Sequence, residues 1–428
     1  MSRFLKYLFS FISSVVVLSV GFVIYIIWFQ PPFYFPKPTG QYAVGTKTYH
    51  WIDANRKEIL HDDPAHPYRE LMVKIWYPST LKLRRAGPAQ GKSAEKPTTP
   101  YAPYFVDYFK KNKPLIWLAL LSRPMYCYAK PDATLTTDIP QLPIIIFSPG
   151  FRSIYDGNTS SCEELASQGY IVVGTSHPYN NSVIQFPDGR IILNKTYNPD
   201  DSAEIWLADV QFVLNQLEQL AHNEKSIFYQ RLDLNHIGMF GHSMGGSTAI
   251  KSSLFDSRIK AAVNLDGALF GSKITKKIDK PCMVMLAEIG VNFNERPLTQ
   301  QEWKKHGIHS LEEEIAAKAD YLPALKQLAQ SAQHDFYTRV IKDAGHFDFC
   351  DLTLLKSASP IVKIIATLDS SILSILKLGS IDGFRATEIV NAYLVTFFNK
   401  YLKGRPSAIL DGTSKKYAEV ESKLWANA

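Results

Sequence analysis

Cysteine is scarce in this chain, and the cysteines that it has are widely spaced. The 428 residues contain four, and no two of them stand in a C-x-x-C pair. The sequence therefore offers no support for a zinc or disulfide-exchange motif, and we expect no metal site. In an oxidising compartment the thiols allow more than one disulfide pairing, or they stay free and buried as small apolar groups. They are Cys127, Cys162, Cys282 and Cys350.

The chain also lacks dense clusters of positive charge and internal repeats. Lysine and arginine number 47 against 40 acidic residues, a formal net charge of +7, and the basic residues are scattered. A nucleic-acid reader shows a basic stripe interleaved with aromatic residues, and none is present. We therefore expect no nucleic-acid partner. The mild positive excess is compatible with an anionic membrane surface.

One long apolar run stands at the N-terminus. Arg3 and Lys6 precede the uncharged stretch 7–29, whose 23 residues are enough to cross a bilayer as a tilted helix. A cleaved signal peptide has a shorter apolar region and a small-residue cleavage site, for which only Ser19 and Gly21 qualify. We predict an uncleaved signal anchor, with a cleaved, secreted form as the alternative. Positive charge before the span places the rest of the chain outside the cytoplasm.

The remaining pattern divides the chain into three parts. Residues 1–38 are the predicted transmembrane helix and a proline-rich linker, 39–405 the catalytic domain and 406–428 a C-terminal tail. Within the domain, short apolar runs alternate with longer amphipathic segments, which indicates a mostly parallel sheet with helices on both faces. The predicted strands are 42–52, 70–77, 143–147, 170–174, 236–240, 259–264, 282–287 and 337–341, and the predicted helices are 162–168, 203–220, 246–254, 311–332 and 386–401.

The sharpest motif lies between a predicted strand and a predicted helix. Residues 241–246 read GHSMGG, with Ser243 at the centre of a G-x-S-x-G pattern. Small residues on either side allow a tight turn that exposes the serine hydroxyl, and the following helix directs backbone N–H groups at a developing oxyanion. We predict Ser243 as a nucleophile, the alternative being a turn with a capping serine. His242 is expected to pack beneath this turn.

A serine nucleophile needs a base, which a carboxylate orients. His346 follows the last strand of the predicted parallel sheet and is the expected base, ahead of His177 and His242. Two carboxylates compete for the orienting role. Asp266 ends the strand after the nucleophile, Glu288 ends the next one, and both lie where an active site belongs in such a sheet. The pattern alone does not choose between them.

Several segments taken together resemble the plasma-type platelet-activating-factor acetylhydrolase family. They are GHSMGGST (241–248), AVNLDGALF (262–270), DAGHFDF (343–349), IIIFSPGF with LASQGYIVV (144–173), YAVGTKTY (42–49) and VKIWYPS (73–79). The resemblance runs from about residue 40 to 400. It implies an α/β-hydrolase fold with no cofactor.

The resemblance also completes the predicted site. That family takes its acid from the strand right after the nucleophile, which selects Asp266 over Glu288. It further implies an oxyanion hole made by the backbone N–H groups of Phe151 and Met244. The chain departs from the family pattern at Pro149, where a histidine is usual, so a role of that side chain in shaping the pocket is in doubt.

The resemblance implies phospholipid substrates with short or oxidised sn-2 chains, whereas the residues themselves indicate a lipophilic carboxylic ester. Residues 104–125 fall where that family binds lipid surfaces, and they either enter the bilayer boundary or form an ordinary packed helix pair. The apolar segment 360–378 would line or cap the pocket. Other functions compatible with these motifs are an acyltransferase, a polyesterase, a peptidase and a non-catalytic, membrane-tethered binding module.

Overall fold

The computed structural model describes most of the chain after the N-terminal run. The described residues are 31–82, 96–112, 124–295, 297, 299, 321–358 and 377–425, except 197, 407, 413 and 424, with a few isolated positions before residue 31. The predicted transmembrane segment 7–29 and the apolar segment 360–378 lie almost entirely outside them. Among the helices of the described part, none combines the length and apolar character needed to traverse a bilayer.

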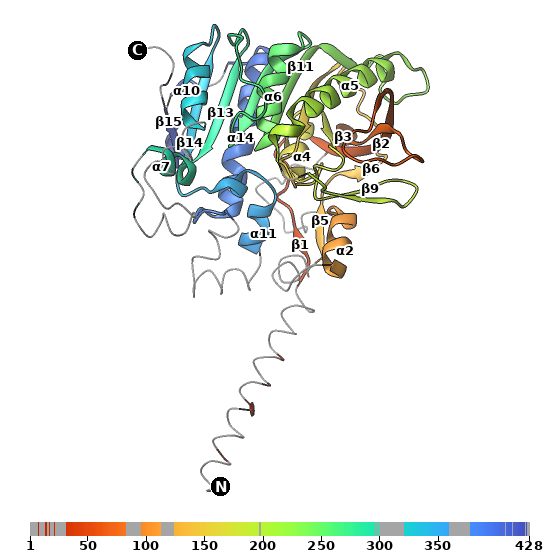
Figure 1. Cartoon of the computed structure of the whole chain (residues 1–428), viewed down its shortest axis with the longest axis horizontal. Coiled ribbons are helices and arrows are strands. Elements are labelled where there is room, and N and C mark those ends of the chain that lie inside the picture. The colour runs from red at the N-terminus through yellow and green to blue at the C-terminus, as the bar shows by residue number, and fades with distance from the viewer. Residues whose placement is uncertain are drawn as a thin grey trace.

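A ten-stranded sheet runs through the domain (Figure 1). Its central strands, from β14 to β8, are parallel, and antiparallel pairs join β15 to β14 and β3 to β8 and β2. From one edge to the other the strands are β15 (Val420–Ser422), β14 (Phe336–Ile341), β13 (Cys282–Ala287), β12 (Ile259–Leu265), β11 (Leu232–His242), β7 (Leu142–Ser148), β8 (Ile171–Thr175), β3 (Tyr68–Lys82), β2 (Tyr42–Lys57) and β6 (Lys130–Pro131).

Helices cover both faces of this sheet, as predicted (Figure 1). On one face lie α4 (Thr159–Ser167) and α14 (Gly383–Lys403), and on the other α5 (Ala203–His222), α6 (Met244–Phe255) and α10 (Leu322–Gln330). The alternation of side chains along each strand explains the two layers. In β7, Ile145 and Phe147 pack with α4 and α14, whereas Ile144 and Ile146 pack with α5. The parallel α/β architecture is thereby confirmed.

The C-terminal segment was expected as a tail, yet three of its residues belong to the sheet. Val420–Ser422 pair antiparallel with Arg339–Ile341 of β14, and Tyr417 and Val420 are buried in the main core. A strand of three residues is too short to show an alternating pattern, so it could not be recognised from the sequence. The domain therefore extends beyond residue 405.

A smaller layer covers one end of the domain (the lower end in Figure 1). A three-stranded sheet of order β1-β5-β4 lies there with α2 and α11. Phe33 and Phe35 pack in one apolar cluster with Ile154, Leu354 and Leu355. The remaining elements are β1 (Phe33–Tyr34), β4 (Thr99–Pro100), α2 (Pro103–Asn112), β5 (Met125–Cys127), β9 (Val183–Gln185), β10 (Ile191–Leu193), α7 (Glu288–Glu295), α11 (Leu352–Ala358) and the 3-10 turns η1 (Asp200–Ser202), η2 (His346–Phe349) and η3 (Lys415–Tyr417).

Part of the segment proposed for lipid contact packs on the protein. In α2, the side chains of Tyr104, Phe105 and Tyr108 are partly buried against the cluster of the small sheet. The ring of Tyr104 stacks on Tyr155 with centroids 5.6 Å apart, and its hydroxyl donates to Asp156. For these residues the structure agrees with the packed-helix reading. Residues 113–123, with Trp117, lie outside the described part of the chain.

Candidate active site

Ser243 occupies the sharp turn between β11 and α6. Its backbone has φ 56° and ψ −124°, a left-handed conformation that is strained for a residue with a side chain. The turn closes because glycines flank it. A Cβ at Gly245 would lie 2.0 Å from the carbonyl oxygen of Ser148, and one at Gly241 would lie 2.2 Å from Gly245. The predicted strand-to-helix turn around Ser243 is therefore present.

His346 and Asp266 form a close pair beside this turn. The distance from His346 Nδ1 to Asp266 Oδ2 is 2.7 Å. Asp266 follows β12 in a left-handed conformation, φ 52°, which aspartate tolerates better than most residues. Its side chain is 6% exposed and that of His346 26%, so the carboxylate is enclosed while the imidazole reaches solvent. This is the arrangement in which a carboxylate orients a base.

Backbone hydrogen bonds hold Ser243 to this pair. The Ser243 amide donates to the carbonyl of Leu265, the residue before Asp266, at 2.9 Å. The His242 ring donates from Nε2 to the carbonyl oxygen of His346 at 2.8 Å. Because these contacts adjoin all three residues, the turn, the acid and the base are fixed relative to one another. The structure brings together Ser243, Asp266 and His346.

Tyr321 is a further member of the site that sequence reasoning missed. Its hydroxyl donates to Asp266 Oδ1 at 3.0 Å, and the amide of Ala287 donates to the same oxygen at 2.8 Å. Burial raises the pKa of Tyr321 well above its ordinary value, so this hydroxyl stays a donor. The residue comes from the segment before α10, far along the chain from Asp266. Nothing in the sequence pattern marked it.

Glu288, the alternative acid, serves the neighbouring loop. Its Oε2 accepts a hydrogen bond from the amide of Asp343 at 2.8 Å, three residues before His346. Asp348, two residues after His346, accepts a hydrogen bond from the amide of Gly345 at 2.8 Å and forms an ion pair with Lys356 at 2.7 Å. Both carboxylates therefore shape the histidine loop.

The two other candidate bases are buried and already engaged. Burial lowers the pKa of His242 well below its ordinary value, so the ring is neutral, and it packs beneath the turn with its centroid 4.6 Å from that of His346. His177 contacts Ser148 and Asp209 and is fully buried. Among the residues that the structure describes, neither ring makes a hydrogen bond to Ser243 or Asp266.

The predicted oxyanion donors flank the turn. Within the described residues, the backbone amides of Phe151 and Met244 have no hydrogen-bond acceptor, so both are available to a ligand. Gly150 brings the first loop close, since a Cβ added there would lie 3.3 Å from Ser243 Cβ. Two free N–H groups beside a nucleophile are what an oxyanion hole requires. The Pro149 position affects neither main-chain donor.

An apolar cluster lies at these donors. Its members are Ala203 and Trp206 of α5 with Met244, and Phe151 and Phe270 pack against them. Ala203, Trp206 and Met244 are buried, whereas Phe151 and Phe270 are partly exposed and offer aromatic surface next to the site, which suits a lipophilic group better than a charged one.

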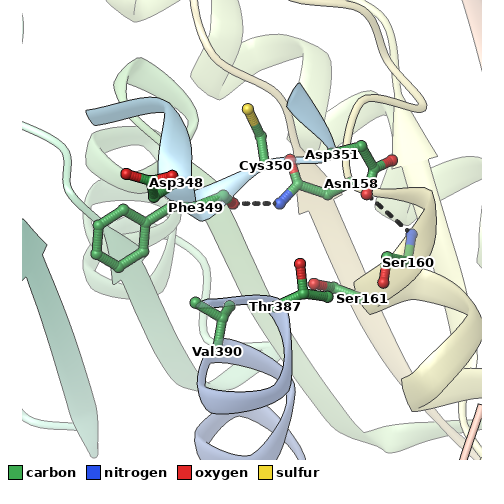
Figure 2. Close-up of a pocket in the computed structure, with 9 residues that line it drawn as sticks. All are labelled: Asn158, Ser160, Ser161, Asp348, Phe349, Cys350, Asp351, Thr387 and Val390. Carbon is green, nitrogen blue, oxygen red and sulfur yellow. Dashed lines mark hydrogen bonds between the residues drawn. The ribbon is translucent and has the colours of Figure 1, made fainter. Parts of the chain in front are cut away.

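A small cavity lies behind the histidine loop, and Figure 2 shows the residues that line it. Its volume is about 10 Å³, room for no more than a water molecule, so it is not a substrate site. Asn158 Nδ2 donates to the Phe349 carbonyl at 2.7 Å, and Asp351 accepts the amide of Ser160 at 3.2 Å (Figure 2). These bonds join the start of α4 to the segment that follows His346.

The four cysteines are free thiols. Cys127, Cys162 and Cys282 are buried, and Cys350 is partly buried. Burial raises the pKa of Cys282 to about 12, so its thiol stays protonated and is a poor nucleophile. Of the two readings of the cysteines, the structure agrees with small buried apolar groups.

Comparison with known proteins gives one family over nearly the whole chain. The sequence model of "Platelet-activating factor acetylhydrolase, isoform II" matches residues 28–207 and 209–405. The match spans the Ser243 turn, Asp266 and His346, and it confirms the resemblance found in the sequence.

Similar proteins of known name or structure are esterases. A "probable 1-alkyl-2-acetylglycerophosphocholine esterase" of Arthroderma benhamiae is 25% identical over 403 residues, 91% of this chain and 93% of the relative. A platelet-activating factor acetylhydrolase of Cavia porcellus is 24% identical over 67% of this chain and 63% of its own length. The solved structure of a ferulic acid esterase from Streptomyces cinnamoneus gives a TM-score of 0.68 at 26% identity, covering 91% of this chain and 99% of the other.

Proposed function

This chain belongs to the family of platelet-activating factor acetylhydrolase, isoform II, and we propose that Ser243, His346 and Asp266 are the catalytic residues of this serine esterase. The observation that carries the proposal is the 2.7 Å contact of His346 Nδ1 with Asp266, beside a serine in a strained turn. Asp266 accepts a hydrogen bond from His346 Nδ1–H, which leaves Nε2 free to act as a base.

The reaction proceeds in two halves. Ser243 Oγ attacks the ester carbonyl while its proton passes to His346 Nε2, and the carbonyl oxygen becomes an oxyanion that the Phe151 and Met244 amides stabilise. The carbonyl re-forms, the bond to the alcohol breaks, and the alcohol leaves with the proton from His346. Water then attacks the acyl-enzyme with His346 again as base, which releases the acid and restores Ser243.

The proposed substrates are phospholipids with short or oxidised sn-2 acyl chains. The names of the Arthroderma benhamiae and Cavia porcellus relatives support an acetylglycerophosphocholine-type ester. The partly exposed rings of Phe151 and Phe270, which pack at the oxyanion donors, support a lipophilic substrate. The ferulic acid esterase of similar structure indicates that this scaffold also accepts other esters, so the acyl and alcohol groups must be compared directly.

The proposed location is a membrane surface, with residues 7–29 as an anchor and the catalytic domain outside the cytoplasm. The uncharged run and the preceding Arg3 and Lys6 support this orientation. Phe33 and Phe35 bring the chain into the domain beside Ile154, close after the Phe151 loop. An anchor that joins the domain at Phe33 would hold the end of the sheet that carries the Phe151 loop toward the lipid. Protease protection in sealed vesicles, read with an antibody to the domain, tests this orientation.

The test of the reaction compares the full chain with two serine variants. We expect the wild type in detergent micelles to hydrolyse p-nitrophenyl acetate and butyrate faster than the palmitate, and an sn-2 acetyl phospholipid faster than one with two long chains. Ser243→Ala should abolish all turnover. Ser253→Ala is the matched control, because Ser253 is a buried serine of α6, the helix that follows Ser243, and its hydroxyl donates to the Ile250 carbonyl.

Equal turnover by the wild type and Ser243→Ala would refute the catalytic assignment. Faster palmitate hydrolysis would keep the esterase and refute the short-chain proposal. If every ester were left intact, the non-catalytic binding module would become the better explanation.

A further inference from the structure

A second serine, histidine and aspartate lie in a chain of hydrogen bonds beside the candidate site. The hydroxyl of Ser148 is 3.0 Å from His177 Nε2, and His177 Nδ1 is 2.9 Å from Asp209 Oδ2. We call these three residues the inner triad. They come from the end of β7, the loop after β8 and the middle of α5, and each is 0% exposed. Since no substrate can reach Ser148, the inner triad is not a second nucleophilic centre.

Two arginines fix the protonation of the inner triad. Arg69 donates to both oxygens of Asp209, at 2.7 and 3.1 Å, and Arg56 Nη2 lies 2.9 Å from Asp209 Oδ1. Burial opposes the ionisation of Asp209, but Arg69 and His177 outweigh it and hold its pKa below the ordinary value. Burial lowers the pKa of His177, so the ring is neutral. His177 Nδ1–H therefore donates a hydrogen bond to Asp209, and Nε2 accepts a hydrogen bond from the Ser148 hydroxyl.

The ring of His177 has little freedom to move. It stacks on Trp206 with centroids 3.8 Å apart and planes 8° apart. Trp206 is itself fixed, because its indole N–H donates to Asn180 Oδ1 at 2.7 Å. Because the His177 ring is fixed, its Nε2 lies in one place relative to Ser148. The hydrogen bond to Nε2 therefore favours one rotamer of the Ser148 side chain.

Ser148 begins the loop that carries the Phe151 amide. The far end of this loop is fastened to the same segment that holds His177, since the Arg152 amide donates to the Asn180 carbonyl at 2.8 Å and the Ser182 amide to the Ser153 carbonyl at 2.9 Å. The loop is thus held on both sides of Phe151. A shift of its first residue would move the Phe151 N–H relative to Ser243.

We propose that His177 and Asp209 are positioning residues of the esterase reaction, which act through Ser148 to hold the Phe151 amide at oxyanion distance. This inference rests on the proposed function. It assigns a role to a histidine that the sequence ranked only as an alternative base. A purely structural role would make the same residues matter for stability but not for the binding of the transition state.

The experiment uses Ser148→Ala and His177→Gln in the full chain. For each variant, kcat and KM for p-nitrophenyl butyrate are measured, with the inhibition constant of a butyl boronic acid, which forms a tetrahedral adduct with an active serine. Removing one oxyanion donor outright costs about 10²–10³ in kcat, so a displaced donor should cost about 10–100-fold. We expect kcat to fall by that factor, KM to stay within about twofold, and the boronic acid to bind more weakly by a similar factor as kcat.

Val213→Ala is the matched control. Val213 lies one helical turn after Asp209 on the same buried face of α5, and its apolar side chain belongs to the core and takes no part in the hydrogen bonds of the inner triad. It should lower the melting temperature while leaving kcat and boronic acid inhibition at wild-type values.

Three results would overturn the proposal: unchanged kcat in Ser148→Ala, a rise in KM alone with unchanged inhibition, or an equal loss of kcat in Val213→Ala. If His177→Gln fails to fold, Ser148→Ala decides, because it removes only a hydroxyl. A wild type without esterase activity, or a fully active Ser243→Ala, would refute the proposed function instead.

Discussion

The molecule holds two sets of serine, histidine and aspartate, and their surroundings differ. Around Ser243 the base is 26% exposed, and the serine and the acid have left-handed backbones. In the inner triad, the His177 and Asp209 side chains are 0% exposed and Arg69 pairs with the carboxylate. The residue types are the same, and in both sets the histidine Nδ1 contacts the carboxylate. Exposure of the serine and free N–H donors beside it are what make the first set suitable for catalysis.

The comparison also separates two uses of a buried carboxylate. Asp266 is held by neutral donors, Tyr321 and the Ala287 amide, which leave its charge to act on His346. Asp209 is held by cations, which balance its charge within the core. Loss of Asp266 should therefore cost activity with little loss of stability, whereas loss of Asp209 should cost stability in addition to the effect on kcat that we propose for the inner triad.

The largest expected effect contrasts the two serines. Ser243→Ala should lower kcat by about 10⁴–10⁶-fold, as loss of a nucleophile does in serine hydrolases, whereas Ser148→Ala lowers it far less. A fluorophosphonate probe, followed by intact mass, should add one equivalent to the wild type and to Ser148→Ala. It should add none to Ser243→Ala. Labelling of Ser243→Ala at Ser148 would show that the buried serine is reactive. It would contradict the distinction between a catalytic Ser243 and an inaccessible Ser148.

The next effect distinguishes the two candidate acids. Asp266→Asn should reduce kcat by about 10⁴-fold, because the amide no longer stabilises the imidazolium or selects the productive tautomer. Glu288→Gln is the control, since Glu288 accepts only a loop amide in the structure; we expect less than about a tenfold loss. The melting temperatures of both variants should stay within a few degrees of the wild type. A larger loss of kcat in Glu288→Gln would reverse the assignment of the acid.

Much of the sheet and the core of the site could be predicted because their signals are local. The strand 282–287 was expected and observed with the same bounds, since a continuous apolar run marks a buried parallel strand. Ser243 lies in a recognisable turn motif, and His346 and Asp266 follow strands whose carboxyl ends meet at one edge. Position in the fold was enough to predict Ser243 and His346 and to narrow the acid to Asp266 or Glu288, and the family pattern then chose Asp266.

The inner triad could not be predicted because its members are far apart in sequence. Ser148 and His177 are 29 positions apart, His177 and Asp209 are 32 apart, and Arg69, which pairs with Asp209, is 140 positions away from it. One local signal did exist. Asp209 stands among Trp206, Val210 and Val213 on the buried face of α5, where a lone carboxylate requires a partner. Which partner it has depends on how the elements pack, and only the structure shows that.

The next prediction concerns the arginines that pair with Asp209, and it is measured as a change in stability. Asp209→Asn should lower the free energy of unfolding by about 4 kcal/mol, because Arg69 stays buried, 2% exposed, with half of its ion pairs lost. Adding Arg69→Met to Asp209→Asn should deepen the loss, because Glu58, 4% exposed, then lacks its Arg69 partner. Urea denaturation at neutral pH measures both. A loss below about 1 kcal/mol would mean that Glu58, the other partner of Arg69, is sufficient.

The smallest expected effect concerns Glu163, a buried carboxylate whose pKa is raised by burial, whereas that of Asp209 is lowered by an arginine. Burial raises the pKa of Glu163 from 4.5 to about 7, even though the Ala129 amide donates to it at 2.6 Å. The folded state therefore keeps this proton between pH 4.5 and 7 while the unfolded chain loses it, so the free energy of unfolding falls as pH rises through that window, by up to about 3 kcal/mol. Glu163→Gln keeps an acceptor and cannot ionise. Its stability relative to the wild type should grow across this window in urea titrations, and a constant difference would show that Glu163 is ionised in the fold, as Asp209 is.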